Sequence, residues 1–213
     1  MSSWSELIRQ AEPPEHLVQL YGRDDQLLTG NVTRYLLEGL KRGDGLLVIA
    51  TPEHRAAIVR RMGEEDAGTA AAIRGDRLVL LDARETLDRF MVDGAPDWEL
   101  FVQTVGGICD ELRGRVGGRG IRAFGEMVGL LWIEGHYSAA IQLEGYWNRL
   151  LEDSAICLFC AYPIDPFGSG FESTRLQALL GVHTHLLAGP RTLFTRVPPV
   201  RQPPTAATIL PAL

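Results

Sequence analysis

Cysteine, basic charge and long apolar stretches are all scarce in this chain. Three of the 213 residues are cysteines, too few for the disulfide framework of a secreted protein, so we expect a reducing, cytoplasmic compartment. No apolar run approaches the roughly 18 residues that a membrane span needs, and residues 1–14 lack the apolar core of a secretory signal. The 21 Lys and Arg residues are outnumbered by 27 Asp and Glu residues, which gives a formal net charge of −6. This acidic balance argues against a dedicated binder of nucleic acid or of an anionic membrane.

The rest of the composition is that of an ordinary globular protein. Apolar residues make up 46% of the chain and charged residues 23%, which excludes wholesale disorder. We expect one domain over residues 14–188, preceded by an extension over residues 1–13. Residues 189–213 hold six of the twelve prolines and are predicted to form a proline-rich tail.

Short apolar runs alternate with helical patterns along this domain. Continuous apolar runs are typical of strands that are buried on both faces of a parallel sheet. The predicted strands cover residues 16–21, 46–51, 77–81, 121–128 and 155–162, with further candidates at 183–187 and 192–197. The predicted helices cover residues 25–42, a stretch from 52 onward, 85–91, 98–112, 137–151 and 172–180, and an apolar turn is expected at 129–133. Strands joined by helical crossovers predict a three-layer α/β domain with a mainly parallel central sheet.

The loop after the first predicted strand matches a phosphate-binding loop poorly. When residues 22–29 are laid on the pattern G-x-x-x-x-G-K-[ST], the second glycine is missing and Leu28 replaces the lysine. Asp24 and Asp25 stand where a phosphate would rest, so tight binding of a nucleoside triphosphate is not expected. The alternative is an ordinary loop in which an aspartate caps the following helix.

An ordered set of short motifs resembles the MEDS domain, the methanogen/methylotroph, DcmR-type sensory domain. The set consists of His16-x-x-x-Leu20-Tyr21, Ala50-Thr51-Pro52-Glu53-His54, Gly125-Glu126-Met127-Val128, Trp147-Asn148 and Cys160-Ala161-Tyr162-Pro163. The region from Tyr35-Leu36-Leu37-Glu38-Gly39-Leu40 through a Gly-rich turn and an apolar strand to Thr51-Pro52-Glu53-His54 also resembles the first half of a RecA/KaiC-type ATPase domain. This resemblance implies a RecA-like sheet with a degenerate P-loop. The resemblance implies a sensory domain that binds a small molecule, such as a simple carbon compound, and regulates a kinase or a transcription regulator. The chain shows no second module of either kind, so the output partner would be a separate protein; a homo-oligomer is left open.

We expect the ligand to lie beyond the carboxyl ends of the strands, where open α/β sheets bind ligands. Glu126 stands out because a carboxylate in an apolar segment is expensive to bury without a partner. A structural alternative is a contact with a backbone N–H or with an arginine such as Arg122. Glu144 and Asn148, four residues apart on one helix face, would either bond each other or extend this polar anchor. The candidate ligand-binding residues are Tyr21, Asp24, Asp25, Thr51, Glu53, His54, Glu126, Trp132, Cys160 and Tyr162.

Two pairs of residues suggest metal or redox chemistry. Cys157 and Cys160 are three positions apart in a predicted strand, so their side chains point to opposite faces and are predicted to be buried, reduced and unbridged. His183 and His185 share a face if their segment is extended, but no cysteine or carboxylate lies at ligand spacing beside them. His16, His54 and His136 are scattered along the sequence, and only the fold could bring them near the pair. The sequence therefore predicts no metal site and no cofactor.

Two other functions compete with a sensory domain. One is an enzyme, a degenerate RecA/KaiC-like ATPase that uses Glu53 and Glu126. The other is a ligand-free signalling adaptor that docks through an exposed apolar patch. The chain contains no Gly-x-Ser-x-Gly nucleophile elbow and nothing that marks a catalytic triad, so we expect a protein without catalytic residues.

Overall fold

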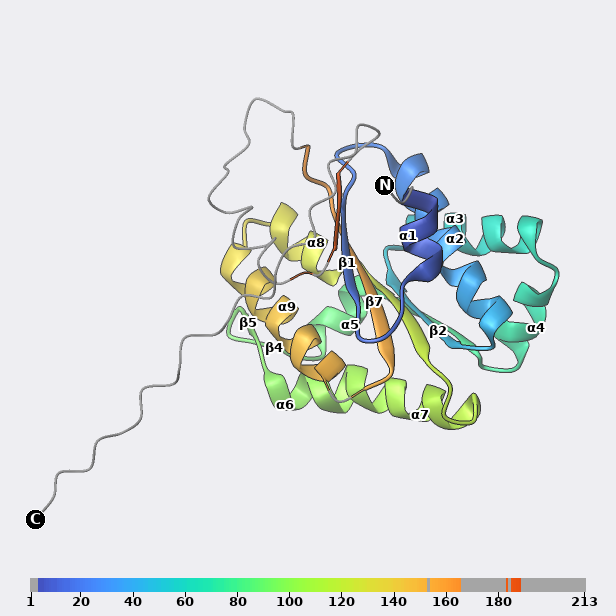
Figure 1. Ribbon diagram of the computed structural model, residues 1–213. Helices are drawn as coiled ribbons and strands as arrows, with labels where there is room; N and C mark the ends of the chain where they lie inside the picture. Colours follow the sequence, from blue (N-terminus) through green and yellow to red (C-terminus); the bar gives the residue numbers. More distant parts are fainter. Residues whose placement is uncertain (1–3, 153, 166–182, 184, 189–213) are drawn as a thin grey trace, which may run out of the picture.

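A six-stranded sheet runs through the centre of the protein, with helices on both sides (Figure 1). The computed structural model describes residues 4–152, 154–165, 183 and 185–188. All neighbouring strands of this sheet are parallel. In spatial order they are β3 (Leu78–Asp82), β2 (Gly45–Ala50), β6 (Ile121–Gly125), β7 (Ile156–Tyr162), β1 (His16–Leu20) and β8 (His185–Ala188).

The helices form one layer on each face of the sheet. The first layer consists of α1 (Trp4–Gln10), α2 (Asp25–Arg42), α3 (Pro52–Glu65) and α4 (Gly68–Arg74). The second consists of α5 (Ala83–Asp88), α6 (Trp98–Phe101), a π-helical turn (Val102–Gly106), α7 (Gly107–Arg115), α8 (Met127–Ile133) and α9 (Tyr137–Glu152). A small antiparallel pair, β4 (Met91–Val92) and β5 (Ala95–Pro96), lies beside this second layer. The arrangement confirms the predicted three-layer α/β fold and is consistent with a RecA-like domain. None of the described helices is both long and apolar enough to cross a membrane.

The central strands are buried on both faces, as their continuous apolar runs predict. Every residue of β1, β2, β6 and β7 is buried. Side chains alternate between the two helical layers, so Cys157 packs with α1–α4 while Cys160 packs with α5–α9. Both cysteines are free and buried, which confirms their predicted separation.

The helix starts follow from local capping. The Asp24 carboxylate accepts a hydrogen bond of 2.8 Å from the Leu27 N–H at the start of α2, as the capping alternative for this loop predicts. Thr51 caps α3 in the same way, and Pro52 occupies its first turn, where a proline loses no helical hydrogen bond.

The segment after β6 differs from the prediction. The predicted strand to residue 128 and the turn at 129–133 are wrong, because β6 ends at Gly125 and α8 begins at Met127. Glu126 turns the chain with φ −107° and ψ −4°, while its N–H still donates to the Ile49 carbonyl at 3.0 Å. Helices α1 and α4 and the β4–β5 pair were not predicted. The predicted helix 172–180 and strand 192–197 lie outside the described residues.

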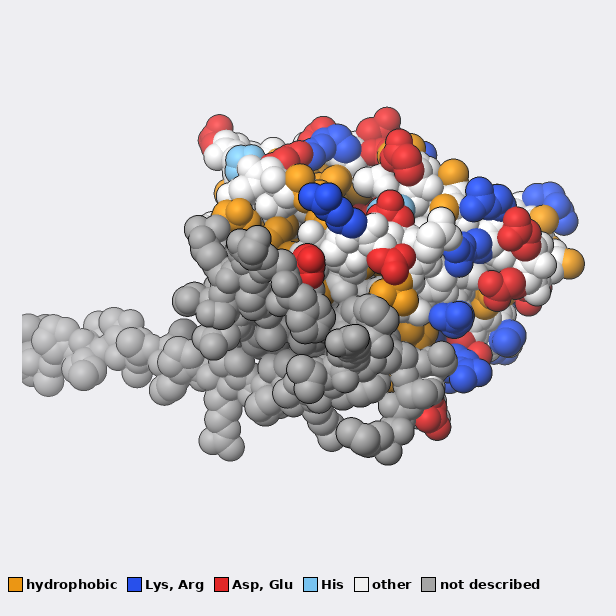
Figure 2. Space-filling model, turned by 90° about the horizontal axis from the view of Figure 1, so that it is seen from above, with side chains coloured by type: hydrophobic (Ala, Val, Ile, Leu, Met, Phe, Trp, Pro, Cys, Tyr) orange, Lys and Arg blue, Asp and Glu red, His pale blue; other side chains and the backbone are white. Residues whose placement is uncertain are grey.

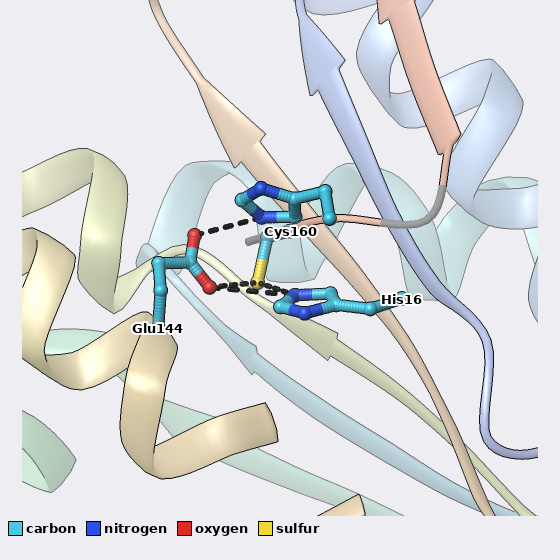
Figure 3. A group of neighbouring side chains, drawn as sticks. His16, Glu144 and Cys160 are labelled. Atoms are coloured by element: carbon cyan, nitrogen blue, oxygen red, sulfur yellow. Dashed lines mark hydrogen bonds and ion pairs between the residues drawn. The ribbon is translucent and has the colours of Figure 1, made fainter. Parts of the chain in front are cut away.

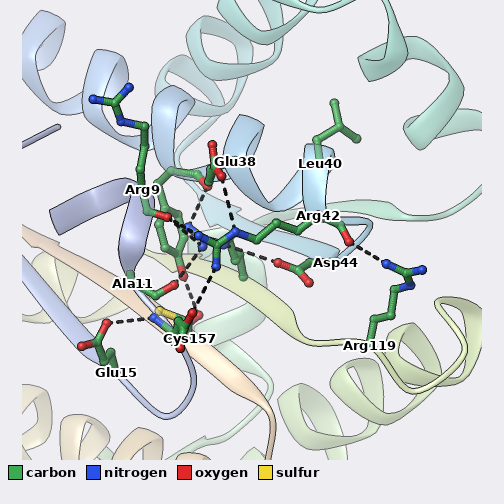
Figure 4. Close-up of polar contacts among 12 residues, drawn as sticks. Arg9, Ala11, Glu15, Glu38, Leu40, Arg42, Asp44, Arg119 and Cys157 are labelled. Carbon is green, nitrogen blue, oxygen red and sulfur yellow. Dashed lines mark hydrogen bonds and ion pairs between the residues drawn. The ribbon is translucent and has the colours of Figure 1, made fainter. Parts of the chain in front are cut away.

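Arg122 does not contact Glu126 but holds the amino-terminal segment in place. Its side chain is buried and donates to the carbonyls of Ile8 at 3.2 Å and Ala11 at 2.8 Å. Two of its partners, Ala11 and Asp44, are labelled in Figure 4. The Asp44 carboxylate lies 3.5 Å away and balances the charge. Helix α1 is therefore held on the face formed by α2, and the arginine alternative for Glu126 is wrong.

Candidate functional site

The structure brings polar side chains together at the carboxyl-terminal edge of the sheet. Thr51 directly follows β2 and Glu126 directly follows β6, and these two strands are neighbours. Three further residues lie beside them: Tyr21 after β1, Asp25 at the start of α2 and His54 in α3. We call these five residues, Tyr21, Asp25, Thr51, His54 and Glu126, the edge network.

Glu126 is the centre of the edge network. One carboxylate oxygen, Oε2, accepts hydrogen bonds from the Thr51 N–H at 2.8 Å and the Thr51 hydroxyl at 3.3 Å. The other oxygen, Oε1, contacts His54 Nδ1. Glu126 is 4% exposed, and these partners offset the free energy that its burial would otherwise cost.

His54 connects this carboxylate to the surface. Its second ring nitrogen, Nε2, lies 3.4 Å from Asp25 Oδ1, and the side chain is 13% exposed. The Tyr21 ring lies beside it and nearly perpendicular to it, with ring centroids 6.1 Å apart and an angle of 80° between the ring planes. The hydrogen bond to Glu126 raises the pKa of His54; burial opposes this effect, and the nearby Asp25 adds to it. An imidazole between two carboxylates can donate protons to both or exchange a partner for a ligand.

The other five predicted site residues lie outside the edge network: two are beside it in sequence, and three are in another part of the protein. Asp24 caps α2, and Glu53 is exposed in the first turn of α3. Trp132, Cys160 and Tyr162 lie on the face of the sheet covered by α8 and α9. The structure therefore brings five of the ten candidates together at the edge and places three of them elsewhere.

The second place is a set of four buried side chains (Figure 3). His16 begins β1, Glu144 comes from α9, Cys160 comes from β7, and His183 lies just before β8. Their exposed fractions are 1%, 0%, 0% and 3% in that order. We call His16, Glu144, Cys160 and His183 the buried cluster.

One potential ligand atom from each side chain points into the buried cluster. His16 Nε2 lies 3.3 Å from Cys160 Sγ and 3.3 Å from Glu144 Oε2. Cys160 Sγ lies 3.6 Å from the same carboxylate oxygen, and His183 Nε2 lies 3.1 Å from Glu144 Oε1. The four atoms all lie within 4.8 Å of one another. Two imidazoles, a thiol and a carboxylate are all common metal ligands.

Neighbouring groups fix the orientation of these side chains. The Asn148 side-chain oxygen lies 2.8 Å from His16 Nδ1 and accepts a hydrogen bond from it when this nitrogen carries the hydrogen. The other ring nitrogen, Nε2, then has a free lone pair that points into the cluster. The Tyr162 hydroxyl donates to Glu144 Oε1 at 2.5 Å, and the Trp132 ring packs edge-on against Tyr162 with centroids 5.5 Å apart.

Burial controls the protonation of the cluster. Burial and the neighbouring His183 lower the pKa of His16 to about 4. Burial alone would raise the pKa of Glu144, but the nearby His183 and His16 outweigh it and lower that pKa. Burial and then the adjacent Glu144 raise the pKa of the Cys160 thiol well above its ordinary value. Burial therefore favours the uncharged forms of His16 and Cys160, whereas the neighbouring histidines favour the charged form of Glu144.

The two histidines of the His183-x-His185 pair do not share a face. Strand β8 begins at His185, so the alternation of an extended strand does not reach back to His183. His185 bonds the Glu15 carboxylate at 3.0 Å, whereas His183 bonds Glu144. Cys160 was the single member of the buried cluster among the ten candidates. The burial of Glu144 could have been inferred from the sequence, because it lies on a helix face with Leu143, Trp147 and other buried apolar residues.

A cavity of about 220 Å³ lies apart from both places, on the α1–α2–α3 side of the protein. Charged side chains dominate its wall, which is formed by Arg9, Arg34, Leu37, Glu38, Lys41 and Glu65. It shares no residue with the edge network or the buried cluster, so it is a separate candidate for a ligand.

The protein is therefore an open, parallel α/β domain with polar side chains gathered beyond its strand ends, the place where domains of this class generally bind ligands. The family model of MEDS, the MEthanogen/methylotroph, DcmR Sensory domain, matches residues 15–184. Because the match covers well over half of the chain, the protein belongs to the MEDS family of sensory domains. A comparison with curated proteins finds no match.

Proposed function

We propose that this protein is a non-catalytic sensory domain that binds a small molecule at the edge network. Binding would regulate a separate signalling protein, such as a kinase or a transcription regulator. Membership of a sensory family supports the role. The observation that carries the location is the contact of partly exposed His54 with buried Glu126, because it joins the surface to the ends of two central strands.

The edge network offers a route from ligand to conformational change. The contact of Glu126 with Thr51 joins the ends of β6 and β2. The contact of Glu126 with His54 links these strand ends to α3, and the contact of His54 with Asp25 links α3 to α2. A ligand that replaces one of these contacts changes the relative free energies of two arrangements of α2 and α3. Such a ligand shifts the population between them in proportion to its difference in affinity.

The edge network suits a small molecule with a hydroxyl, carbonyl or amine group. His54 and Glu126 can each form hydrogen bonds with such groups, and Tyr21 contributes an aromatic ring beside His54. A simple carbon compound with one polar group fits this chemistry better than a polyphosphate.

Several features argue against the ATPase alternative. The single lysine of the chain, Lys41, lies in the last turn of α2, at the end opposite the loop that would hold phosphate. The Asp24 carboxylate already occupies the helix start, where a phosphate would otherwise receive the N–H groups. Both features support a P-loop that has degenerated, and we expect ATP to bind weakly or not at all.

The adaptor alternative lacks a suitable surface among the described residues. The large hydrophobic side chains exposed there are Val92 at 47% and Ile133 at 65%, and they lie in β4 and α8. Figure 2 shows acidic and basic side chains interspersed on the described part of the upper face. Scattered apolar residues of this kind do not make a docking patch.

The test is a thermal-shift screen of the full chain with small alcohols, aldehydes, amines and carboxylic acids, and with Mg-ATP. The affinity of a hit is then measured for Glu126→Gln and for the control Glu65→Gln. Loss of a charge-assisted hydrogen bond worth about 1.5–3 kcal/mol should weaken binding to Glu126→Gln by roughly 10- to 150-fold. Glu65 lines the separate cavity, so a loss confined to Glu65→Gln would place the ligand there and overturn the proposal. Micromolar binding of Mg-ATP would favour the ATPase.

A further inference from the structure

We propose that the buried cluster of His16, Glu144, Cys160 and His183 is a binding site for a zinc-like divalent transition metal ion. Three of the side chains come from β1, α9 and β7, and the fourth, His183, lies two residues before the start of β8. They are far apart in the sequence and adjacent only in the fold; Figure 3 labels three of them, His16, Glu144 and Cys160, on their separate elements.

The spacing of the ligand atoms agrees with a tetrahedral site. Metal–ligand distances of about 2.0–2.1 Å for nitrogen and oxygen and about 2.3 Å for sulfur place the ligand atoms of a zinc tetrahedron about 3.3–3.6 Å apart. The distances are 3.3 Å from His16 Nε2 to Cys160 Sγ, 3.3 Å from His16 Nε2 to Glu144 Oε2, and 3.6 Å from Cys160 Sγ to the same oxygen. Three ligand atoms are therefore already separated as the edges of one tetrahedral face require. His183 Nε2, 3.1 Å from the other carboxylate oxygen, is placed to complete it.

The donor set selects the kind of metal. Two imidazoles and one sulfur favour zinc and similar transition metals, whereas magnesium and calcium require sites built from oxygen. Cys160 as a thiolate and Glu144 as a carboxylate would balance the two positive charges of the ion. Such neutrality is essential here, because every ligand is almost completely buried and an uncompensated charge in the core is costly.

The surrounding residues resemble the outer shell of a metal site. Asn148 holds His16 through Nδ1 at 2.8 Å, which directs Nε2 towards the centre of the cluster. Tyr162 donates to Glu144 at 2.5 Å and so orients the carboxylate. Groups that bond the far side of metal ligands in this way usually raise metal affinity by 10- to 100-fold.

Four protein ligands leave no open position on a tetrahedral ion. Closed sites of this kind stabilise a fold, whereas catalytic sites keep a position for water or substrate. The inference goes beyond the proposed sensory function, because the buried cluster shares no residue with the edge network.

The test uses the full chain after treatment with a chelator and removal of the chelator. Titration with Co²⁺ should reach about one ion per chain and produce the charge-transfer absorption of a cobalt–thiolate bond, and Zn²⁺ should displace it. Zn²⁺ should also raise the melting temperature of the unmutated protein, whereas Mg²⁺ should not. Less than about one-tenth of an ion per chain, or binding without the thiolate band, would overturn the proposal, and neither result depends on a variant that folds.

Two cysteine variants locate the site. Cys160→Ser should lose the thiolate band and weaken binding at least 10-fold. The matched control is Cys157→Ser, since Cys157 is also buried in β7 but points to the opposite layer; it should keep both the band and the affinity. A band that survives in Cys160→Ser contradicts the assignment. Glu126→Gln should retain Co²⁺ binding, so failure of the metal site and failure of the sensory proposal are distinguishable.

Discussion

Glu126 and Glu144 are both buried carboxylates that contact histidine, yet their surroundings differ. Glu126 lies at the end of a strand, and its partner His54 has an exposed side-chain fraction of 13%. Glu144 lies within the second helical layer, and its partners His16 and His183 are both inside the core. A small molecule from solvent can compete for the first histidine without disturbing the core. Access to the second requires movement of packed elements.

Because of this difference, a ligand from solvent can replace contacts in the edge network, whereas the contacts of the buried cluster are retained as long as the core stays folded. The edge network is held together by hydrogen bonds that a ligand can replace one at a time, and its members lie on loops and helix starts. The buried cluster is enclosed by strands and by α9, so a contact that is broken there cannot be replaced readily by a hydrogen bond to water. Loss of stability should therefore be larger in the buried cluster, and dependence on solution conditions should be clearer at the edge.

The largest effect is expected for Glu144→Gln in the metal-free protein. Glutamine keeps the shape but removes the charge, and its amide presents donors to groups that already donate, such as the Tyr162 hydroxyl. Breaking a buried ionic network costs about 3–5 kcal/mol, so urea denaturation with chelator present should show a loss of about 3 kcal/mol. The control Glu152→Gln changes an exposed residue of the same helix and should stay within about 0.5 kcal/mol. Equal effects in the two variants would show that Glu144 is not held by its neighbours.

The next largest loss of stability is expected for Gly129→Ala, at a position between Glu126 of the edge network and the strand β7 that contributes Cys160 to the buried cluster. Gly129 lies in α8, the helix that begins after Glu126, and a Cβ at this position would lie 2.7 Å from the Ala161 carbonyl oxygen in β7. Alanine favours helices by about 1 kcal/mol over glycine, but the clash with backbone should cost about 1–3 kcal/mol, so we expect a net loss of about 1–2 kcal/mol.

Gly145→Ala in α9 is the matched control, because nothing lies within 4 Å of the added Cβ. It should stabilise the protein or leave it unchanged, as measured by the same denaturation. Stabilisation by Gly129→Ala as well would mean that α8 can move away from β7 freely, and the two regions would then be mechanically independent.

For Glu126→Gln we expect a smaller loss of stability, about 1.5 kcal/mol. The glutamine oxygen can still accept from the Thr51 N–H, and its amide can donate to a neutral His54, so no group is left without a partner. The measurement is the free energy of unfolding at neutral pH, with Glu65→Gln in the same helix as His54 as the control. A loss as large as that of Glu144→Gln would remove the distinction between an exchangeable and a retained site.

The sequence predicts the edge network better than the buried cluster for a physical reason. In a parallel sheet the carboxyl ends of neighbouring strands meet, so polar residues that directly follow apolar runs, such as Thr51 and Glu126, can be placed together from the sequence. Glu144 follows no strand, and its contact with His16 depends on how α9 packs over β1 and β7. Spacing along the chain contains no information on that packing.

The fold shows the same limit. The buried strands were predicted because short, uninterrupted apolar runs are typical of strands that are buried on both faces. Asp24 was recognised as a possible helix cap from its position alone. In the apolar run from Ile121 to Ile133, the part after Gly125 was misassigned, because a continuous apolar run has no clear periodicity to distinguish strand from helix. The backbone turn at Glu126, which separates β6 from α8, places this carboxylate at the edge rather than inside the sheet.

The smallest effect is a pH dependence at the edge network. The pKa of His54 is raised by its hydrogen bond to Glu126, with Asp25 adding to the effect, burial opposing it and the Tyr21 ring facing the imidazole. A histidine whose folded pKa exceeds the unfolded value of about 6.5 stabilises the protein fully below that value and ceases to do so as pH rises through the folded pKa.

The stability difference between the wild type and His54→Gln should therefore be larger at about pH 6 than at about pH 9, by up to roughly 1 kcal/mol for a partly exposed pair. Denaturation of both proteins at the two pH values measures it. The same comparison in a Glu126→Gln background isolates the pair, and there the pH dependence should shrink because the principal partner of the charged imidazole is gone. A stability difference that grows towards high pH would mean that His54 is neutral in the folded protein. His54 would then carry no positive charge for Glu126 and Asp25 to stabilise.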